Sequence, residues 1–68
     1  MNYKNCFIQA KPYPLRDAAE WTVHVDIERD TRDGVEHLKK IETGRRFASE
    51  SEAIEFGEAT GMSFVDAM

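Results

Sequence analysis

The amino-acid sequence predicts an α+β fold in which a three-stranded antiparallel β-meander carries one C-terminal α-helix on one face, in the order β-β-β-α. Three observations lead to this prediction. Residues 20–29 alternate apolar and polar side chains, an Asp-Gly pair separates them from a second β-like run at 35–43, and a helix-capping pattern begins at Ser49. With 68 residues, the chain is expected to form one small domain, residues 1–68.

The first predicted strand covers about residues 3–10. Its alternate residues divide between two faces, with Cys6, Ile8 and Ala10 on one and Phe7 and Gln9 on the other. Lys11-Pro12-Tyr13-Pro14 is expected to end this strand, because proline donates no backbone hydrogen bond and restricts the residue before it. Residues 11–19 are then expected to form an irregular connection.

The segment 20–29 is the clearest strand. Its apolar positions are Trp21, Val23, Val25 and Ile27. Polar residues alternate with them, as in a strand that has one buried face, and β-branched side chains suit such a surface. Trp21 is expected to be the largest residue of the core.

Asp33-Gly34 predicts a hairpin turn, because glycine readily adopts a positive φ. The strand that returns from this turn covers about residues 35–43. It is ambiguous which face of this strand is apolar, because Val35 and Ile41 have odd numbers and share one face, whereas Leu38 has an even number and lies on the other. Either a β-bulge shifts the register of this strand, or one of its faces is only partly apolar.

A helix is predicted over about residues 50–61. Ser49 and Glu52 have the spacing of a capping box, in which each side chain bonds to a backbone N–H group of the other residue. The helix either ends or kinks near Gly61, or it continues to residue 66.

Gly57 and Gly61 lie in the middle of the apolar face of this helix. Because glycine weakens a helix, their position predicts a close approach between helix and sheet, with Trp21 as the expected contact. One helix covers one face of the sheet. The other face stays uncovered, which an antiparallel sheet tolerates if that face is polar.

The charge is unevenly distributed along the chain, whose net charge is −4. Residues 1–46 hold all nine Lys and Arg and eight acidic residues, whereas residues 47–68 hold five acidic residues and no Lys or Arg. The last third is therefore the acidic part. A general attraction to nucleic acid or to an anionic membrane is not expected.

The single cysteine rules out an intramolecular disulfide, which secreted domains of this size usually need. No apolar run resembles a signal peptide or a transmembrane segment, so a cytoplasmic location is expected. One cysteine and two separated histidines do not make a structural zinc site, and the glycines do not fit a phosphate-binding loop. No metal and no cofactor are expected.

The residues with catalytic potential do not form a recognisable constellation. His24 and His37 lie on neighbouring predicted strands. If Arg29 faces Gly34, His24 lies opposite Lys39 or Lys40 and out of register with His37. Cys6 is expected to be a buried, inert thiol. The chain is therefore expected not to be an enzyme.

A basic cluster around the hairpin and the turn at residues 44–46 is the other candidate site. It is suited to phosphate or to an acidic partner, although neighbouring acidic residues nearly cancel its charge. Phe7 marks a self-association surface if it lies on the uncovered face of the sheet; alternatively it packs against Tyr3 or the proline-containing connection. The candidate partner-binding residues are Phe7, Arg29, Arg32, Lys39, Arg45 and Arg46.

One sequence pattern resembles a known group of proteins. The segment from Phe47 to Gly57 is followed by Gly61 and by Val65-Asp66, and a Trp-x-Val-x-Val-x-Ile strand begins at Trp21. The pattern covers most of the chain and resembles small uncharacterised bacterial β-β-β-α proteins; it is more distantly similar to haemolysin-regulator-like small proteins. The resemblance implies a bacterial cytoplasmic domain. It transfers no functional residue, because the group has no assigned activity.

Three functions remain open. The first is a small non-enzymatic protein-interaction domain that acts as a monomer or a homodimer and binds an unknown protein or itself. The second is a regulatory or nucleic-acid-associated protein that uses the basic hairpin and turn. The third is an enzyme whose site is completed by oligomerisation, with His24 and His37 as the general bases.

Overall fold

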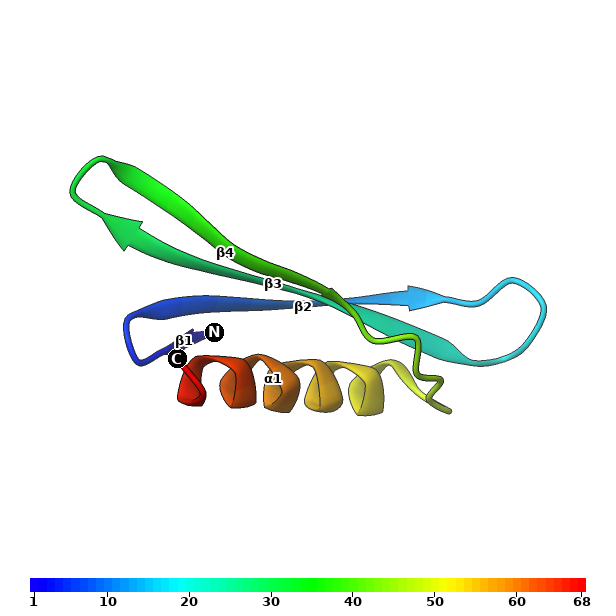
Figure 1. Ribbon diagram of the computed structural model, residues 1–68. Helices are drawn as coiled ribbons and strands as arrows, with labels where there is room; N and C mark the ends of the chain where they lie inside the picture. Colours follow the sequence, from blue (N-terminus) through cyan, green and yellow to red (C-terminus); the bar gives the residue numbers. More distant parts are fainter.

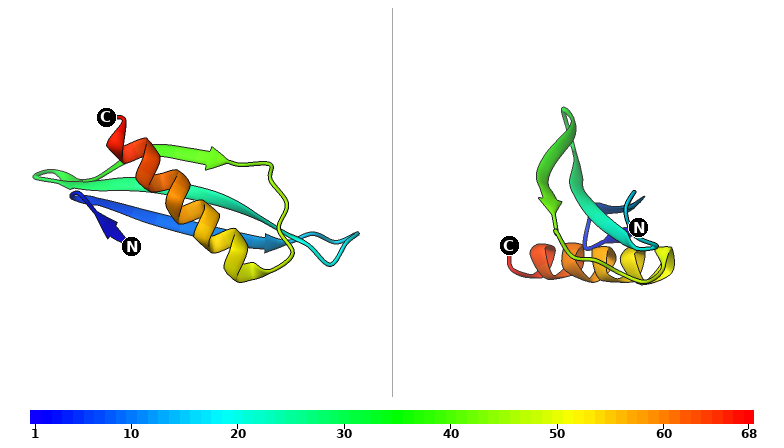
Figure 2. Two further views of the ribbon diagram at one scale, coloured as in Figure 1. Left: turned by 90° about the horizontal axis from the view of Figure 1, so that it is seen from below. Right: turned by 90° about the vertical axis from the view of Figure 1, so that its right-hand side faces the viewer.

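The computed structural model describes all residues, 1–68. The elements are β1 (Asn2–Tyr3), β2 (Cys6–Pro14), β3 (Trp21–Thr31), β4 (Gly34–Glu42) and α1 (Glu50–Asp66). The strands form an antiparallel sheet in the order β1-β2-β3-β4, and α1 crosses one face of this sheet over β2 and β3 (Figures 1 and 2). The α+β class and the C-terminal helix are confirmed, but the predicted number of three strands is wrong.

The additional strand arises because the chain reverses direction within the predicted strand 3–10. Lys4 and Asn5 have φ angles of 48° and 67°, and their turn pairs Tyr3 with Cys6. Asparagine enters this left-handed region comparatively often, whereas lysine seldom does. The Lys-Asn pair is therefore a weak turn signal in the sequence, and the prediction missed the turn.

The expectation that the prolines end the first strand is also wrong, because β2 continues to Pro14. The backbone N–H of Ile8 donates to the carbonyl of Met1 at 2.7 Å, so the N–H groups of even-numbered residues in β2 point away from β3. Pro12 and Pro14 have the same parity as Ile8. Their missing N–H groups therefore face the outer edge, where no ladder bond is lost.

A β-bulge accounts for the mixed pattern of β4. Ile27 pairs with Lys39 and Glu28 pairs with His37, which leaves Leu38 without a partner. Leu38 and Ile41 consequently both pack against the core, although their parities differ. Of the two alternatives for this strand, the bulge is confirmed.

The core lies between α1 and the two central strands. Its largest fully buried side chains are Ile8, Val23, Val25 and Ile27. The expectation for Trp21 is wrong, because this side chain is only partly buried at the start of β3, where its backbone pairs with Phe47. Branched aliphatic residues in the middle of β2 and β3 therefore form the core in its place.

The predicted close approach of helix and sheet is confirmed, but against other residues than Trp21. A Cβ atom added to Gly57 would lie 2.8 Å from Cβ of Ala10 and from Cγ2 of Val23, and one added to Gly61 would overlap Ile8. Together with Ala53 and Val65, the two glycines are the buried residues of α1. Small side chains thus let the helix backbone lie directly on β2 and β3.

The two ends of α1 are held by different contacts. Oγ of Ser49 accepts a hydrogen bond from the backbone N–H of Glu52 at 3.2 Å, which is one half of the predicted capping box. The helix passes Gly61 and ends at Asp66, so the longer alternative is confirmed. The carboxylate of Asp66 binds Nζ of Lys4 at 2.6 Å and accepts from the hydroxyl of Tyr3 at 2.9 Å. These contacts connect the helix end to the β1–β2 turn.

α1 does not have the length and hydropathy of a helix that could cross a membrane.

Candidate functional site

The face of the sheet opposite α1 is not covered by any element (Figure 2). The strand register assigns to it the side chains that alternate with the core residues. We call this surface the open sheet face. It consists of Phe7, Gln9, Lys11 and Tyr13 from β2, Thr22, His24, Asp26, Glu28 and Asp30 from β3, and Val35, His37, Lys40 and Glu42 from β4.

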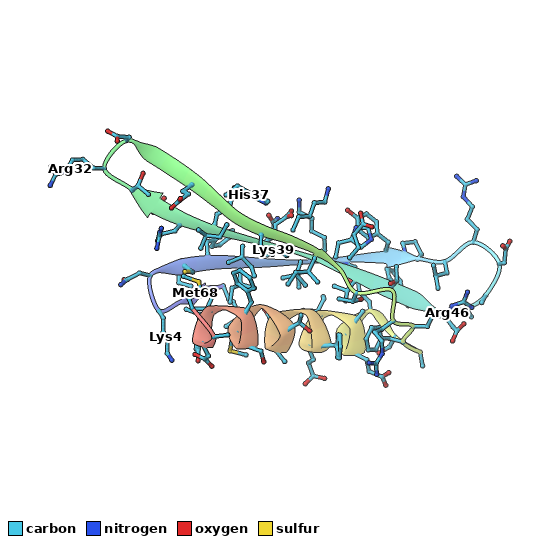
Figure 3. The ribbon with its side chains drawn as sticks, viewed as in Figure 1. Lys4, Arg32, His37, Lys39, Arg46 and Met68 are labelled. Atoms are coloured by element: carbon cyan, nitrogen blue, oxygen red, sulfur yellow. The ribbon has the colours of Figure 1, made fainter.

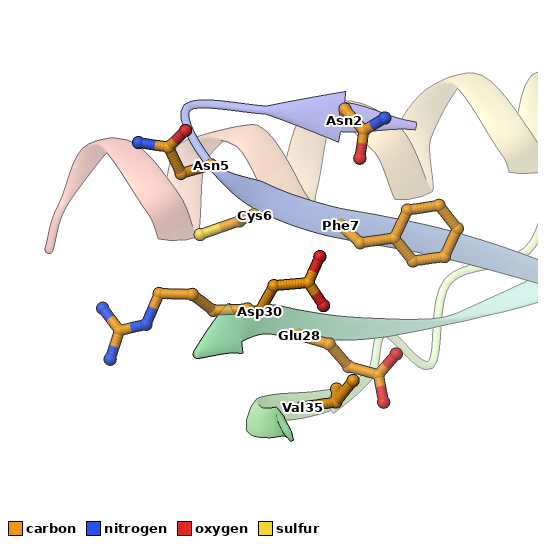
Figure 4. Close-up of a pocket in the computed structure, with 8 residues that line it drawn as sticks. Asn2, Asn5, Cys6, Phe7, Glu28, Asp30 and Val35 are labelled. Atoms are coloured by element: carbon orange, nitrogen blue, oxygen red, sulfur yellow. The ribbon is translucent and has the colours of Figure 1, made fainter. Parts of the chain in front are cut away.

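A depression of about 780 Å³ lies at the end of this face near the β3–β4 hairpin (Figure 4). We call it the Phe7 hollow. Its lining residues are Asn2, Asn5, Cys6, Phe7, Glu28, Arg29, Asp30 and Val35. Phe7 lies opposite Glu28 in the register and Val35 lies opposite Asp30, so each of these acidic residues has an apolar neighbour. Phe7 is 44% exposed and Val35 is 64% exposed.

The two carboxylates of the hollow have no cation bound to them. Neither Glu28 nor Asp30 forms an ion pair, in contrast to Asp26 on the same face, which binds Nζ of Lys11 at 2.6 Å. The Lys11 ammonium holds the pKa of Asp26 below its ordinary value, mainly through this hydrogen bond. Asp26 thus has a cation in direct contact, whereas Glu28 and Asp30 have none.

Arg29 also lines the hollow, but its guanidinium is engaged elsewhere. Nη2 of Arg29 lies 2.5 Å from Oε1 of Glu36, and this hydrogen bond raises the pKa of Arg29. Glu36 faces Arg29 across the β3–β4 ladder. The hollow therefore carries a negative charge bordered by two exposed apolar side chains, which suits a cationic group on an aliphatic stem.

The two histidines lie on the open sheet face in separate positions. Gly34 pairs with Thr31, so the assumed pairing of Gly34 with Arg29 is wrong, and His24 faces Glu42 instead of a lysine. The ring of His24 packs against Tyr13 with centroids 4.8 Å apart. His37 faces Glu28, and its Nε2 lies 3.7 Å from the carboxylate of Asp26. No group of three or more His, Cys, Asp or Glu side chains has a metal-binding arrangement.

The predicted basic residues are spread along the molecule, whose longest dimension is 44 Å. Arg32 lies at the tip of the β3–β4 hairpin, Lys39 lies on β4, and Arg46 lies near the opposite end (Figure 3). Arg46 binds Glu20 at 3.5 Å, and the guanidinium of Arg45 lies 5.1 Å from the ring centre of Phe56. The structure does not bring these residues together in one patch.

Of the predicted site residues, Phe7 and Arg29 line the hollow. Cys6, which was expected to be a buried thiol, is a free thiol that is 2% exposed. Sequence reasoning missed Glu28, Asp30 and Val35 as site residues. The sequence contained a signal for two of them. Glu28 and Asp30 alternate with the apolar residues of β3 and therefore belong to its polar face. Val35 could be placed on the same face only once the bulge was known.

Comparison of the chain with protein families, curated proteins and solved structures finds no match. The resemblance to small bacterial β-β-β-α proteins therefore stays a prediction.

Proposed function

We propose that this chain is a small, cytoplasmic, non-enzymatic protein-interaction domain that contacts its partner through the Phe7 hollow on the open sheet face. One observation carries the proposal. Phe7, an aromatic side chain that is 44% exposed, stands beside two carboxylates that have no ion-pair partner. Aromatic residues are enriched at the buried centre of protein interfaces, and charged groups around them favour an oppositely charged partner.

The strand backbone supports this use of Phe7. The residue lies inside β2, which pairs with β1 on one side and with β3 on the other. Its position is thus fixed before any partner arrives, and binding orders little more than the side chain itself. Burial of the exposed part of the ring would contribute about 25 cal/mol for each Å² removed from water.

The arrangement of the reactive residues supports a non-enzymatic role. The thiol of Cys6 is buried in the core, and each histidine packs against another residue on an uncovered surface. A nucleophile within hydrogen-bond reach of a general base, which covalent catalysis needs, is not found among these residues.

Site-specific photo-crosslinking in the source cell tests the proposal. A photoreactive phenylalanine analogue replaces Phe7 in one variant and Glu55, which is exposed on the outer side of α1, in a control variant. We expect a defined protein adduct from position 7 and none from position 55. The absence of an adduct at position 7, or the same adduct from both positions, would contradict a contact through the open sheet face.

A further inference from the structure

We propose that the Phe7 hollow is filled by the hairpin tip of a second copy of this chain, whose Arg32 lies between Glu28 and Asp30. This inference rests on the proposed function and names the partner. An arginine matches both features of the hollow, since its aliphatic stem can lie on Phe7 and its guanidinium can bind carboxylates.

Arg32 is available for such a contact. It is exposed in the turn between β3 and β4 and forms no ion pair within its own chain. The hairpin extends past the end of α1, and Arg32 points away from the body of the molecule at its tip (Figures 1 and 3). One chain thus presents a cation without an ion-pair partner at the tip of the hairpin, and two carboxylates without one on the part of β3 that leads to this tip.

The spacing along β3 permits a reciprocal contact. Asp30 and Glu28 precede Arg32 by two and four positions. When two hairpins stack face to face with their β3 strands antiparallel, about a twofold axis that lies between the two faces and passes between Asp30 and Thr31, Arg32 of each copy lies over the interval between Glu28 and Asp30 of the other. At about 3.3 Å per residue, Arg32 and that interval each lie about 5 Å from the axis. The two contacts are identical, as an isologous dimer requires.

The apolar residues of the hairpin support the same arrangement. Val35 pairs with Asp30 in the register and is 64% exposed, the largest exposure among the large apolar side chains. In this antiparallel face-to-face arrangement Val35 lies near the axis and meets its counterpart in the second copy. Contact between the two side chains removes from water a surface that the monomer leaves exposed.

The outer edge of β4 is less suited to joining two copies. A strand edge pairs readily with another chain unless bulges or charged residues prevent it. β4 has the bulge at Leu38 and exposed lysines at positions 39 and 40. These features favour association through the face of the sheet over association through its edge.

The contact is confined to the hairpins and the Phe7 hollow, so the dimer is expected to be weak. A standard interface buries about 800 Å² on each partner, and smaller interfaces are usually transient. The total accessible surface of the chain is 4781 Å², so a standard interface would take about a sixth of it. We expect a dissociation constant between about 10 µM and 1 mM.

A charge-swap experiment with the purified full chain tests the proposal. Arg32→Glu and Glu28→Arg are each measured alone and as an equimolar mixture by sedimentation velocity, up to concentrations of about 1 mM. Each variant alone brings like charges together at both contacts and is expected to dimerise at least tenfold more weakly than the parent chain. The mixture restores both oppositely charged contacts and is expected to form heterodimers of about the parent affinity.

The control is Arg16→Glu, which makes the same charge change in the exposed loop between β2 and β3. It is expected to leave the dissociation constant unchanged within about twofold. Circular dichroism spectra of all variants verify that the exposed substitutions leave the fold intact. A monomeric parent chain at all concentrations, or a mixture no stronger than its components, would overturn the proposal.

The failure of this inference can be distinguished from failure of the proposed function. If position 7 crosslinks to a different protein while the purified chain stays monomeric, the open sheet face is an interaction surface, and the second copy is ruled out as its occupant. If position 7 crosslinks to nothing and the purified chain also stays monomeric up to about 1 mM, both proposals fail.

Discussion

A methyl group on the α-carbon of Gly61 would overlap Cγ2 of Ile8, so α1 lies on β2 with no space for a side chain at this position. The same Ile8 is 1% exposed and cannot move toward solvent without opening the core. The contact sets how closely α1 can approach the sheet. It thereby explains why a residue that weakens helices stands in the middle of this one.

Gly61→Ala is therefore expected to destabilise the protein. Alanine improves helix propensity by about 1 kcal/mol, but overpacking of a filled core costs about 1–3 kcal/mol. We expect the free energy of unfolding in urea to fall by about 1 kcal/mol. Ser63→Ala, at an exposed position of the same helix, is the control and is expected to be neutral or slightly stabilising. A Gly61→Ala variant more stable than the parent would show that α1 can move away from β2.

Removal of the helix cap is expected to have a separate effect. Ser49→Ala removes the hydroxyl that accepts from the backbone N–H of Glu52, and the loss should lower the free energy of unfolding by about 1 kcal/mol. Ser51→Ala removes a hydroxyl that makes no hydrogen bond and should change stability by less than about 0.5 kcal/mol. Equal effects of the two variants, measured by urea unfolding, would argue against the cap.

The alternating direction of the backbone N–H groups along β2 predicts which of its positions tolerate proline. Gln9 points its backbone N–H toward β3, because Ile8 points its own toward β1. Gln9→Pro removes a ladder bond and is expected to lower the free energy of unfolding by about 2 kcal/mol or more, whereas Gln9→Ala, the control, keeps that bond. Pro12→Ala restores an N–H that faces the outer edge and is expected to change stability by less than about 1 kcal/mol. Similar stability of Gln9→Pro and Gln9→Ala in urea would contradict this register.

Acid is expected to weaken the protein through Asp26. Its pKa in the folded chain is lowered from 3.8, mainly by the hydrogen bond from Lys11. A lowered folded pKa adds stability that is fully present above 3.8 and is lost as the pH falls through the lowered value. Urea unfolding between about pH 7 and pH 2 should show this loss in the parent chain and a smaller loss in Asp26→Asn.

The control for this prediction is Asp17→Asn, since Asp17 forms no ion pair. This variant should follow the parent chain throughout the acid range. Lys11 has the opposite dependence, because its folded pKa is raised above 10.5; its contribution is present below 10.5 and is lost as the pH rises through the raised value. An acid profile of Asp26→Asn identical to that of the parent chain would contradict the assigned ion pair.

The parts of the fold that the sequence predicted correctly depend on local signals. The alternation in β3 places Val23, Val25 and Ile27 on one face whatever lies beside the strand. The Ser49 cap and the two glycines of α1 likewise act within one helix or across one packed surface. Such patterns can be recognised without knowledge of the topology.

The parts that the sequence could not predict depend on which strand lies beside another. Pro12 is compatible with a strand only because its missing N–H faces the edge of the sheet. Leu38 joins the core only because a bulge places it there, and the same bulge sends Val35 to the open sheet face. The Phe7 hollow depends on the bulge, which places Val35, and on the missed β1–β2 turn, which places Asn2 and Asn5. The candidate partner residues predicted from charge alone were therefore mostly other residues.

A dilution series of the isotope-labelled chain, followed by its amide NMR signals, tests most directly whether the hairpin tip of a second copy fills the Phe7 hollow. Concentration-dependent shifts are expected at Phe7, Glu28, Arg32 and Val35, and none are expected at Glu55 or Glu58 on α1. Signals that do not change up to about 1 mM, or changes confined to α1, would contradict the proposed contact.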